Sequence, residues 1–351
     1  MSADVDACVE RATEERRVAL PEPRGPITTT LFKTLLEAPG APLSGDPELL
    51  ADDPLADDDL QLALYICYEI HYAKLEGVDE RWEWAPSLMG FRAALEARFQ
   101  AGLDALLSPC SSKECLDVGG SLQRLVADDS GPSLSRYVET QASQEELLEL
   151  VIHRSAYQLK EADPHSWAIP RLTGAPKVAL LEVQADEYGG GNVERMHSML
   201  FAKTMDALGL DASYGHYISR LPGITLATVN LMSYFGLHRR LRGALVGHLA
   251  AFEMTSSIPN RRYGNGLRRL GHGPRATDFY DEHVEADAVH ESIAAWDLAH
   301  GLARVEPALA PDILIGARAL LALESRWAQH LMDAWSEGIT SLRSPALTSV
   351  L

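Results

Sequence analysis

Cysteine is scarce in this sequence of 351 residues. The four cysteines are Cys8, Cys67, Cys110 and Cys115, and no two pairs of them have the spacing of a zinc site. A disulfide framework or a structural zinc site is therefore not expected. Free thiols are typical of a cytoplasmic protein, and cytoplasmic is the location that we predict.

Basic residues are also few, because 31 Lys and Arg face 50 Asp and Glu, which gives a formal charge of −19. Nucleic acid phosphates and anionic membrane surfaces would repel such a chain, so we expect neither partner. No apolar run reaches the roughly 18 to 20 residues of a membrane span. The opening residues, Met-Ser-Ala-Asp-Val-Asp, lack the basic and apolar regions of a signal peptide.

Strand patterns, internal repeats, a phosphate-binding glycine loop and a Gly-x-Ser-x-Gly motif are all missing. Apolar residues instead recur at helical spacing, which predicts an all-α fold. The predicted helices cover about 58–76, 88–107, 144–161, 176–208, 224–235, 237–256, 277–301 and 308–337. Residues 109–132 are broken by Pro and Gly. We therefore predict an N-terminal helical subdomain at 1–135 and a core domain at 136–351.

The strongest functional pattern lies in the predicted helix 277–301. His283, Asp287 and His290 stand at positions i, i+4 and i+7, which fall on one face of a helix. Imidazole and carboxylate together suit iron, manganese or zinc. The alternative is a solvated acidic helix with incidental histidines.

Other acids and one histidine are placed where they would need a partner. Glu161 ends a predicted helix, where the helix dipole disfavours a carboxylate, and Glu253 lies between two apolar residues. Glu187, Glu194 and His197 would share one stripe if the three glycines at 189–191 left their helix continuous. Taken alone, Glu161 is by default a solvated acid and His197 a core histidine. Among the later arginines, Arg261 and Arg262 are candidates to clamp a substrate carboxylate.

Together these residues come from four helices, and helical bundles that point carboxylates and histidines inward are the usual scaffold of a carboxylate-bridged di-iron site. In their order and spacing they resemble the haem-oxygenase-like di-iron oxidases and oxygenases, known as iron-containing redox enzymes. The resemblance covers about 143–305 and implies a haem-oxygenase-like helical bundle with an N-terminal extension. The metal ligands that it implies are Glu161, Glu187, His197, Glu253, His283, Asp287 and His290, with Glu194 as a competitor of Glu187.

The resemblance further implies that Glu161, His197 and His290 hold one iron. Glu253, His283 and Asp287 would hold the second, with a bridging carboxylate, and the assignment of each histidine to one iron or the other stays open. N-oxygenating members have an extra acid ten residues before the histidine of the second helix. Glu187 occupies that position, whereas Glu194 occupies the position that other members use.

We therefore expect an O2-dependent enzyme with two irons that cycle between Fe(II) and Fe(III), acting on a small molecule of specialised metabolism. Oxygenation of an amine or guanidine-like nitrogen is the leading reaction. Alternatives are C–C cleavage, decarboxylation or desaturation of an amino acid or fatty acid, and an inactive metal-binding protein. Zinc hydrolysis needs only three protein ligands and leaves several acids unexplained. Without a reductant-binding domain, the electrons would come from a separate donor, a chemical reductant or the substrate. A homodimer is also expected.

Overall fold

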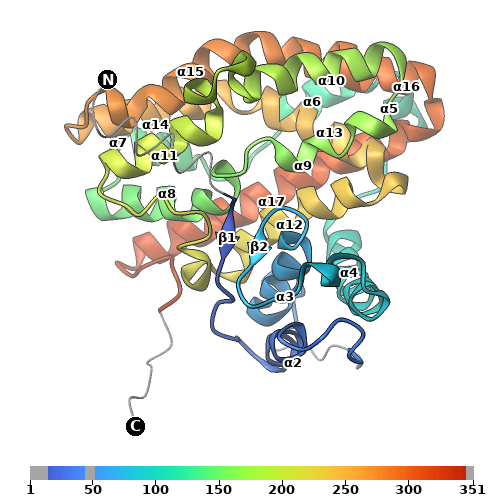
Figure 1. The fold of residues 1–351 in the computed structure, drawn as a ribbon. Helices are drawn as coiled ribbons and strands as arrows, with labels where there is room; N and C mark the ends of the chain where they lie inside the picture. The colour runs from blue at the N-terminus through green and yellow to red at the C-terminus, as the bar shows by residue number, and fades with distance from the viewer. Residues whose placement is uncertain (1–14, 44–51, 345–351) are drawn as a thin grey trace.

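The computed structural model describes residues 15–43 and 52–344 (Figure 1). Helices make up nearly all the regular structure of this part of the chain, so the predicted all-α class is confirmed. The expectation of no strand is wrong at one place. Arg17–Val18 (β1) and Lys74–Leu75 (β2) form a parallel pair of two residues each. None of the helices in the described ranges has the length and apolar character needed to cross a membrane.

The N-terminal helices are Pro26–Leu35 (α2), Asp58–Glu69 (α3) and Pro86–Leu106 (α4), with a short 3-10 turn at Glu80–Trp84 (η1). The side chain of Asp57 caps α3 by accepting from the backbone N–H of Leu60. Asp59 is fully buried, and its carboxylate accepts from the first backbone N–H groups of α2, which holds the two helices together. Helix α3 ends at Glu69, seven residues before the predicted end.

The predicted joint contains helices of its own: Ser112–Leu116 (α5), Val118–Ala127 (α6) and, just after it, Leu134–Thr140 (α7). Helices α5 and α6 both pack against α17, the long helix Ala310–Ser336. One cluster of buried hydrophobic residues runs through the described chain from Val18 to Leu342. The division at 135/136 stays a prediction.

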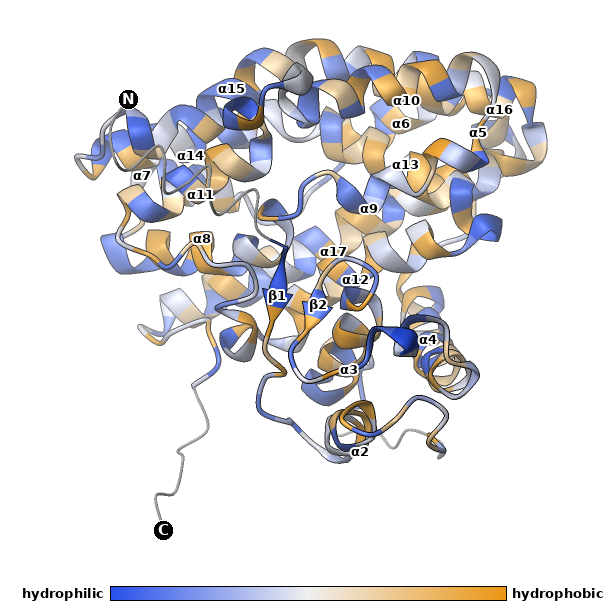
Figure 2. Cartoon of the chain, in the orientation of Figure 1, coloured by the Kyte–Doolittle hydropathy of each residue, from blue (hydrophilic) through white to orange (hydrophobic). Residues whose placement is uncertain are grey.

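The core helices lie above the N-terminal group in Figure 1. Hydrophilic and hydrophobic residues are interleaved along most of them (Figure 2). Their bounds are Gln144–Gln158 (α8), Asp163–Ser166 (α9), Gly174–Glu187 (α10), His197–Ala207 (α11), Gly223–Leu237 (α12), Arg242–Met254 (α13), Ser257–Arg269 (α14), Pro274–Ser292 (α15) and Gly301–Val305 (α16). A π-helix at Ile293–His300 (η7) joins α15 to α16. Short 3-10 turns occupy Ile169–Arg171 (η2), Gly189–Gly191 (η3), Val193–Arg195 (η4), Ile218–Arg220 (η5), Arg239–Leu241 (η6) and Pro307–Leu309 (η8).

Helices α13 and α17 pack backbone against backbone. A Cβ atom on Gly247 would lie 1.7 Å from the carbonyl oxygen of Ile313, and one on Gly316 would lie 1.9 Å from that of Ala244. No larger residue fits at either crossing point. The glycines thus fix the position of α13, which carries Glu253.

Three predicted helices end or bend where the site begins. The helix predicted at 144–161 ends at Gln158, so Glu161 lies in the following turn. The helix predicted at 176–208 is two helices, because Gly189, Gly190 and Gly191 all have positive φ and turn the chain. The helix predicted at 277–301 begins at Pro274 and becomes a π-helix after Ser292. Helix α14, which contains Arg261 and Arg262, was not predicted.

Candidate metal centre

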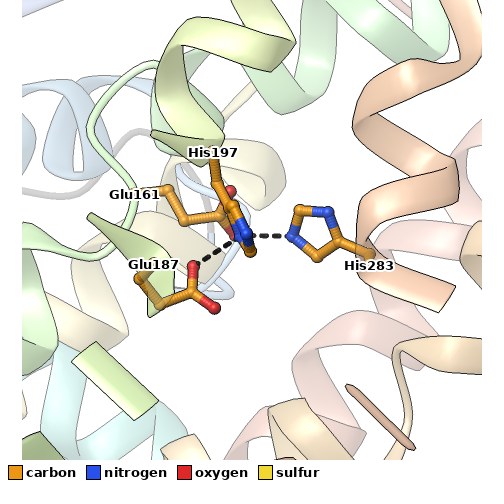
Figure 3. Close-up of side chains that lie close together, drawn as sticks. All are labelled: Glu161, Glu187, His197 and His283. Atoms are coloured by element: carbon orange, nitrogen blue, oxygen red, sulfur yellow. Dashed lines mark ion pairs between the residues drawn. The ribbon is translucent and has the colours of Figure 1, made fainter. Parts of the chain in front are cut away.

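Six of the predicted ligands meet in the core of the bundle, in two groups. Glu161, Glu187, His197 and His283 form the first group, and Glu187, Glu253 and His290 form the second. Within each group the candidate ligand atoms lie within 4.8 Å of one another, and every one of these residues is buried. Figure 3 shows the first group, with its side chains converging from separate segments. Since Glu187 belongs to both groups, the two are contiguous.

Glu161 enters the site from the turn between α8 and α9, and is only 2% exposed. Its Oε1 atom lies 3.7 Å from Nε2 of His283. Its Oε2 atom is buried and accepts no hydrogen bond from any residue that the structure describes. A buried carboxylate oxygen without a donor is costly, and a bound cation would satisfy it.

The glycine turn brings Glu187 and His197 together. Glu187 is the last residue of α10 and His197 the first of α11, and Oε2 of Glu187 lies 2.9 Å from Nδ1 of His197. The turn is tight at Gly189, where a Cβ would lie 2.7 Å from the backbone of Arg195 and Met196. The same turn leaves Glu194 exposed on η4, outside both groups. The stripe expected for Glu187, Glu194 and His197 is therefore wrong for Glu194, because the helix is not continuous.

His283 and His290 come from α15, and each is held by a contact outside the group of ligand atoms. Nδ1 of His283 donates to the carbonyl oxygen of Phe279 at 2.7 Å, which leaves Nε2, 3.7 Å from Glu161, as the nitrogen that can bind a metal. Nε2 of His290 lies 3.0 Å from the carboxylate of Asp186, while its Nδ1 lies 3.5 Å from Glu253 and 3.8 Å from Glu187. Carboxylates or carbonyls that hold metal-binding histidines in this way are common behind metal sites.

This pairing differs from the one that the resemblance implied. His283 stands with Glu161 and His197, and His290 stands with Glu253, so the two histidines exchange groups. Asp287 belongs to α15, but its side chain lies outside those that the structure describes. Its role as a ligand stays a prediction.

The electrostatics of the cluster favour a bound cation. Burial raises the pKa of Glu161 and of Glu253 above the usual range, and the charge of Glu187 raises both further. Although burial opposes protonation of His290, the carboxylates of Glu253, Asp186 and Glu187 raise its pKa to about 9. Without a metal, Glu161, Glu253 and His290 therefore bind protons more readily than the same groups would in water. The mixed carboxylate and imidazole donors fit iron.

A pocket of about 370 Å³ leads to the first group. Its lining includes Glu161 and His283 of this group, together with Arg154, Arg262 and Glu324. This volume lies within the range of small-molecule sites. Of the two arginines predicted to bind substrate, Arg262 lines the pocket. Arg261 is exposed and does not.

Sequence reasoning missed several residues around the site. Asp186 carries no signal of its own in the sequence, because it is an acid next to the stronger candidate Glu187. Its side chain is 62% exposed. Arg154 and Glu324 were missed because they lie on helices far apart in the sequence, α8 and α17, and carry no motif. Only the packing of these helices shows that the two residues meet.

The architecture and the buried cluster agree with comparisons to known proteins. Residues 148–325, just over half of the chain, match the family described as iron-containing redox enzymes. The chain belongs to this family and is an oxidoreductase, which confirms the resemblance found in the sequence and the haem-oxygenase-like fold.

Among individual proteins, nitrosourea synthase of Streptomyces achromogenes subsp. streptozoticus is 28% identical over 136 residues. These residues make up 39% of this chain and 29% of that protein, so the similarity spans less than a third of the relative's length.

Proposed function

We propose that the chain is a di-iron oxygenase that uses O2 to oxygenate an amine or guanidine-like nitrogen of a small molecule. Membership of the iron-containing redox enzymes supports oxidation by iron. The name of the distant relative supports nitrogen as the site of oxidation, because a nitrosourea carries a nitroso group on a urea nitrogen. The observation that carries the proposal is the position of Glu187, whose carboxylate belongs to both groups of candidate ligands.

Each group supplies the donors for one metal ion. Glu161, His197 and His283 would hold one iron, Glu253 and His290 the other, and Glu187 would bridge them. Two bound Fe(II) ions would supply the electrons that reduce O2.

The chain's own residues shape the rest of the chemistry. Phe279 and Asp186 orient His283 and His290 through the ring nitrogens that face away from the ligand atoms. The aromatic side chains of Phe201, Phe252 and Phe279 line the pocket and limit the access of water to the metal end. A substrate in this pocket would present its reacting nitrogen beside Glu161 and His283.

The first test is anaerobic titration of the metal-free protein with Fe(II), followed by O2 uptake with ascorbate as the reductant. We expect two irons per chain, and O2 consumption that increases with amine or guanidine compounds. Products that gain oxygen on nitrogen support the proposal. Products that lose CO2 or two hydrogens would instead identify decarboxylation or desaturation. One iron or none per chain would contradict the di-iron site.

A matched pair of variants tests the bridging role. Glu187→Gln removes a charged oxygen from both groups, so we expect iron binding to fall below two per chain and O2 uptake to be lost. Glu194→Gln alters an exposed acid seven residues later and should behave like the parent protein. Equal effects of the two substitutions would exclude Glu187 as a bridge.

A further inference from the structure

We propose that the pocket recognises a carboxylate on the substrate through the guanidinium of Arg262, so that the substrate is amino-acid-like, with its carboxylate at Arg262 and its nitrogen beside Glu161 and His283. The reaction of that nitrogen rests on the proposed function. The recognition of the carboxylate rests on the pocket itself and is tested separately.

Of the two arginines among the described residues that line the pocket, Arg262 has the weaker contacts. The acidic and basic side chains along it are Asp129, Arg154, Glu161, Arg262, Glu324 and His283. Arg154 and Glu324 form a two-pronged ion pair, with N–O distances of 2.8 and 2.6 Å, and the guanidinium lies 3.9 Å from the centre of the Trp327 ring. This pair is neutral as a unit and geometrically complete. Asp129 is exposed at the rim and accepts from the backbone of Gly131.

Arg262 has much weaker contacts. Its Nη1 atom lies 3.4 Å from Oγ of Ser133 and 3.3 Å from Oγ of Ser135, and its Nε atom lies 3.9 Å from the carboxylate of Glu139. These distances are long for charge-assisted hydrogen bonds, which are usually about 2.7 to 2.9 Å. About a third of the side chain (32%) remains exposed. A ligand carboxylate would give the guanidinium shorter bonds, and Ser133 and Ser135 also line the pocket as further donors.

Arg262 is not needed to hold its helix in place. Helix α14 is attached to α7 by Arg269, which donates to the carbonyl oxygens of Val138, Glu139 and Ala142 at 2.6 to 3.0 Å. Gly266 also allows close backbone contact with Val138. Removing the guanidinium of Arg262 should therefore change the charge of the pocket and leave the packing of α14 intact.

The test measures binding to the full chain without added iron, by isothermal titration calorimetry. The probes are two pairs that share a nitrogen end and differ in the carboxylate: L-arginine with agmatine, and L-lysine with cadaverine. In the parent protein we expect at least one amino acid to bind about tenfold more tightly than its partner, as a charge-assisted pair would give. Arg262→Gln should reduce this preference to near one.

Arg261→Gln is the control, because it removes the same charge from the neighbouring position on α14, outside the pocket. It should retain the preference of the parent protein. Equal binding of both members in each pair, an unchanged preference in Arg262→Gln, or no binding of either amino acid would overturn the inference.

Failure of this inference is distinguishable from failure of the proposed function. Iron-loaded protein that consumes O2 and oxygenates agmatine or cadaverine, without any preference for a carboxylate, would retain the function and refute the role of Arg262. Binding that depends on the carboxylate and on Arg262, without oxidation of any probe by iron-loaded protein, would retain the recognition site and refute the N-oxygenase.

Discussion

The ammonium group of Lys160 lies 2.7 Å from the carboxylate of Glu69, and both side chains are completely buried. The ammonium also lies 4.9 Å from the centre of the Tyr65 ring and 4.5 Å from that of Tyr72. Glu69 belongs to helix α3 of the N-terminal group, whereas Lys160 immediately precedes Glu161. This ion pair therefore connects the N-terminal helices to the turn that carries a candidate metal ligand.

Lys160→Met should destabilise the protein by about 3 to 5 kcal/mol, because it leaves the carboxylate of Glu69 buried without its cation. The double variant Lys160→Met, Glu69→Gln should recover much of this loss. Urea unfolding of both variants measures the difference, and Arg81→Gln, at an exposed pair with Asp79, is the control, which should leave the stability nearly unchanged. A loss below 1 kcal/mol for Lys160→Met would contradict the importance of the pair.

Asp186→Asn should weaken Fe(II) binding about 10- to 100-fold, as substitutions behind metal-binding histidines do. The carboxylate accepts from Nε2 of His290 and fixes the ring, so its loss frees the imidazole to turn. Competition with a coloured iron chelator measures the affinity. Glu182→Gln removes an exposed acid from the same helix and should have no effect, which separates orientation of the ring from general surface charge.

Gly189→Ala should prevent the turn between α10 and α11 from closing, because its Cβ would lie 2.7 Å from the backbone of Arg195 and Met196 and its φ is 69°. Gly190→Ala has a similar φ of 60° but open space around the Cβ, so it should cost only about 1 to 2 kcal/mol. We expect two-iron binding to be lost in the first variant and retained in the second. Iron content after gel filtration, together with the thermal unfolding temperature, checks both.

Acid should weaken the folded state through a buried histidine pair. Nε2 of His165 lies 3.1 Å from Nδ1 of His248, and burial lowers the pKa of His165 to about 3 and that of His248 well below its ordinary value. As the pH falls, the two histidines therefore bind protons in the unfolded chain before they do so in the folded chain. The stability is fully present above about pH 6.5 and falls as the pH drops toward 3, by up to about 1.4 kcal/mol per pH unit for each histidine.

Chemical unfolding between pH 7 and pH 4 measures this slope. The double variant His165→Asn, His248→Asn should flatten it, since the amides can pair without titrating. His216→Gln, on the exposed surface, should leave it unchanged. A slope that is the same in the parent protein and in the double variant would show that other groups govern the acid response.

The sequence was sufficient for the helical class, because helical periodicity is a local pattern, and its resemblance to a known family indicated six residues of the buried cluster. The sequence was not sufficient where the path of the chain in three dimensions decides which side chains are buried or line the pocket. Glu187 and Glu194 look alike in sequence, and only the turn of positive-φ glycines buries one and exposes the other. Arg261 and Arg262 are neighbours with the same chemistry, and only the rotation of α14 places one at the pocket. The placement of His283 in the first group of ligands and of His290 in the second likewise depends on how α15 packs against its neighbours.

The glycine contacts between α13 and α17 have a consequence for how the site is tuned. Gly247 precedes Glu253 by six residues on one rigid helix, and it rests directly on the backbone at Ile313. Helix α17 therefore acts as a fixed reference surface for the Glu253 carboxylate, and its Glu324 and Trp327 form part of the pocket wall. A change in the distance between the two helices at this crossing would alter both the spacing of the ligands and the width of the pocket. The geometry of the site and the size of the molecule that it accepts are thus set by the same pair of helices.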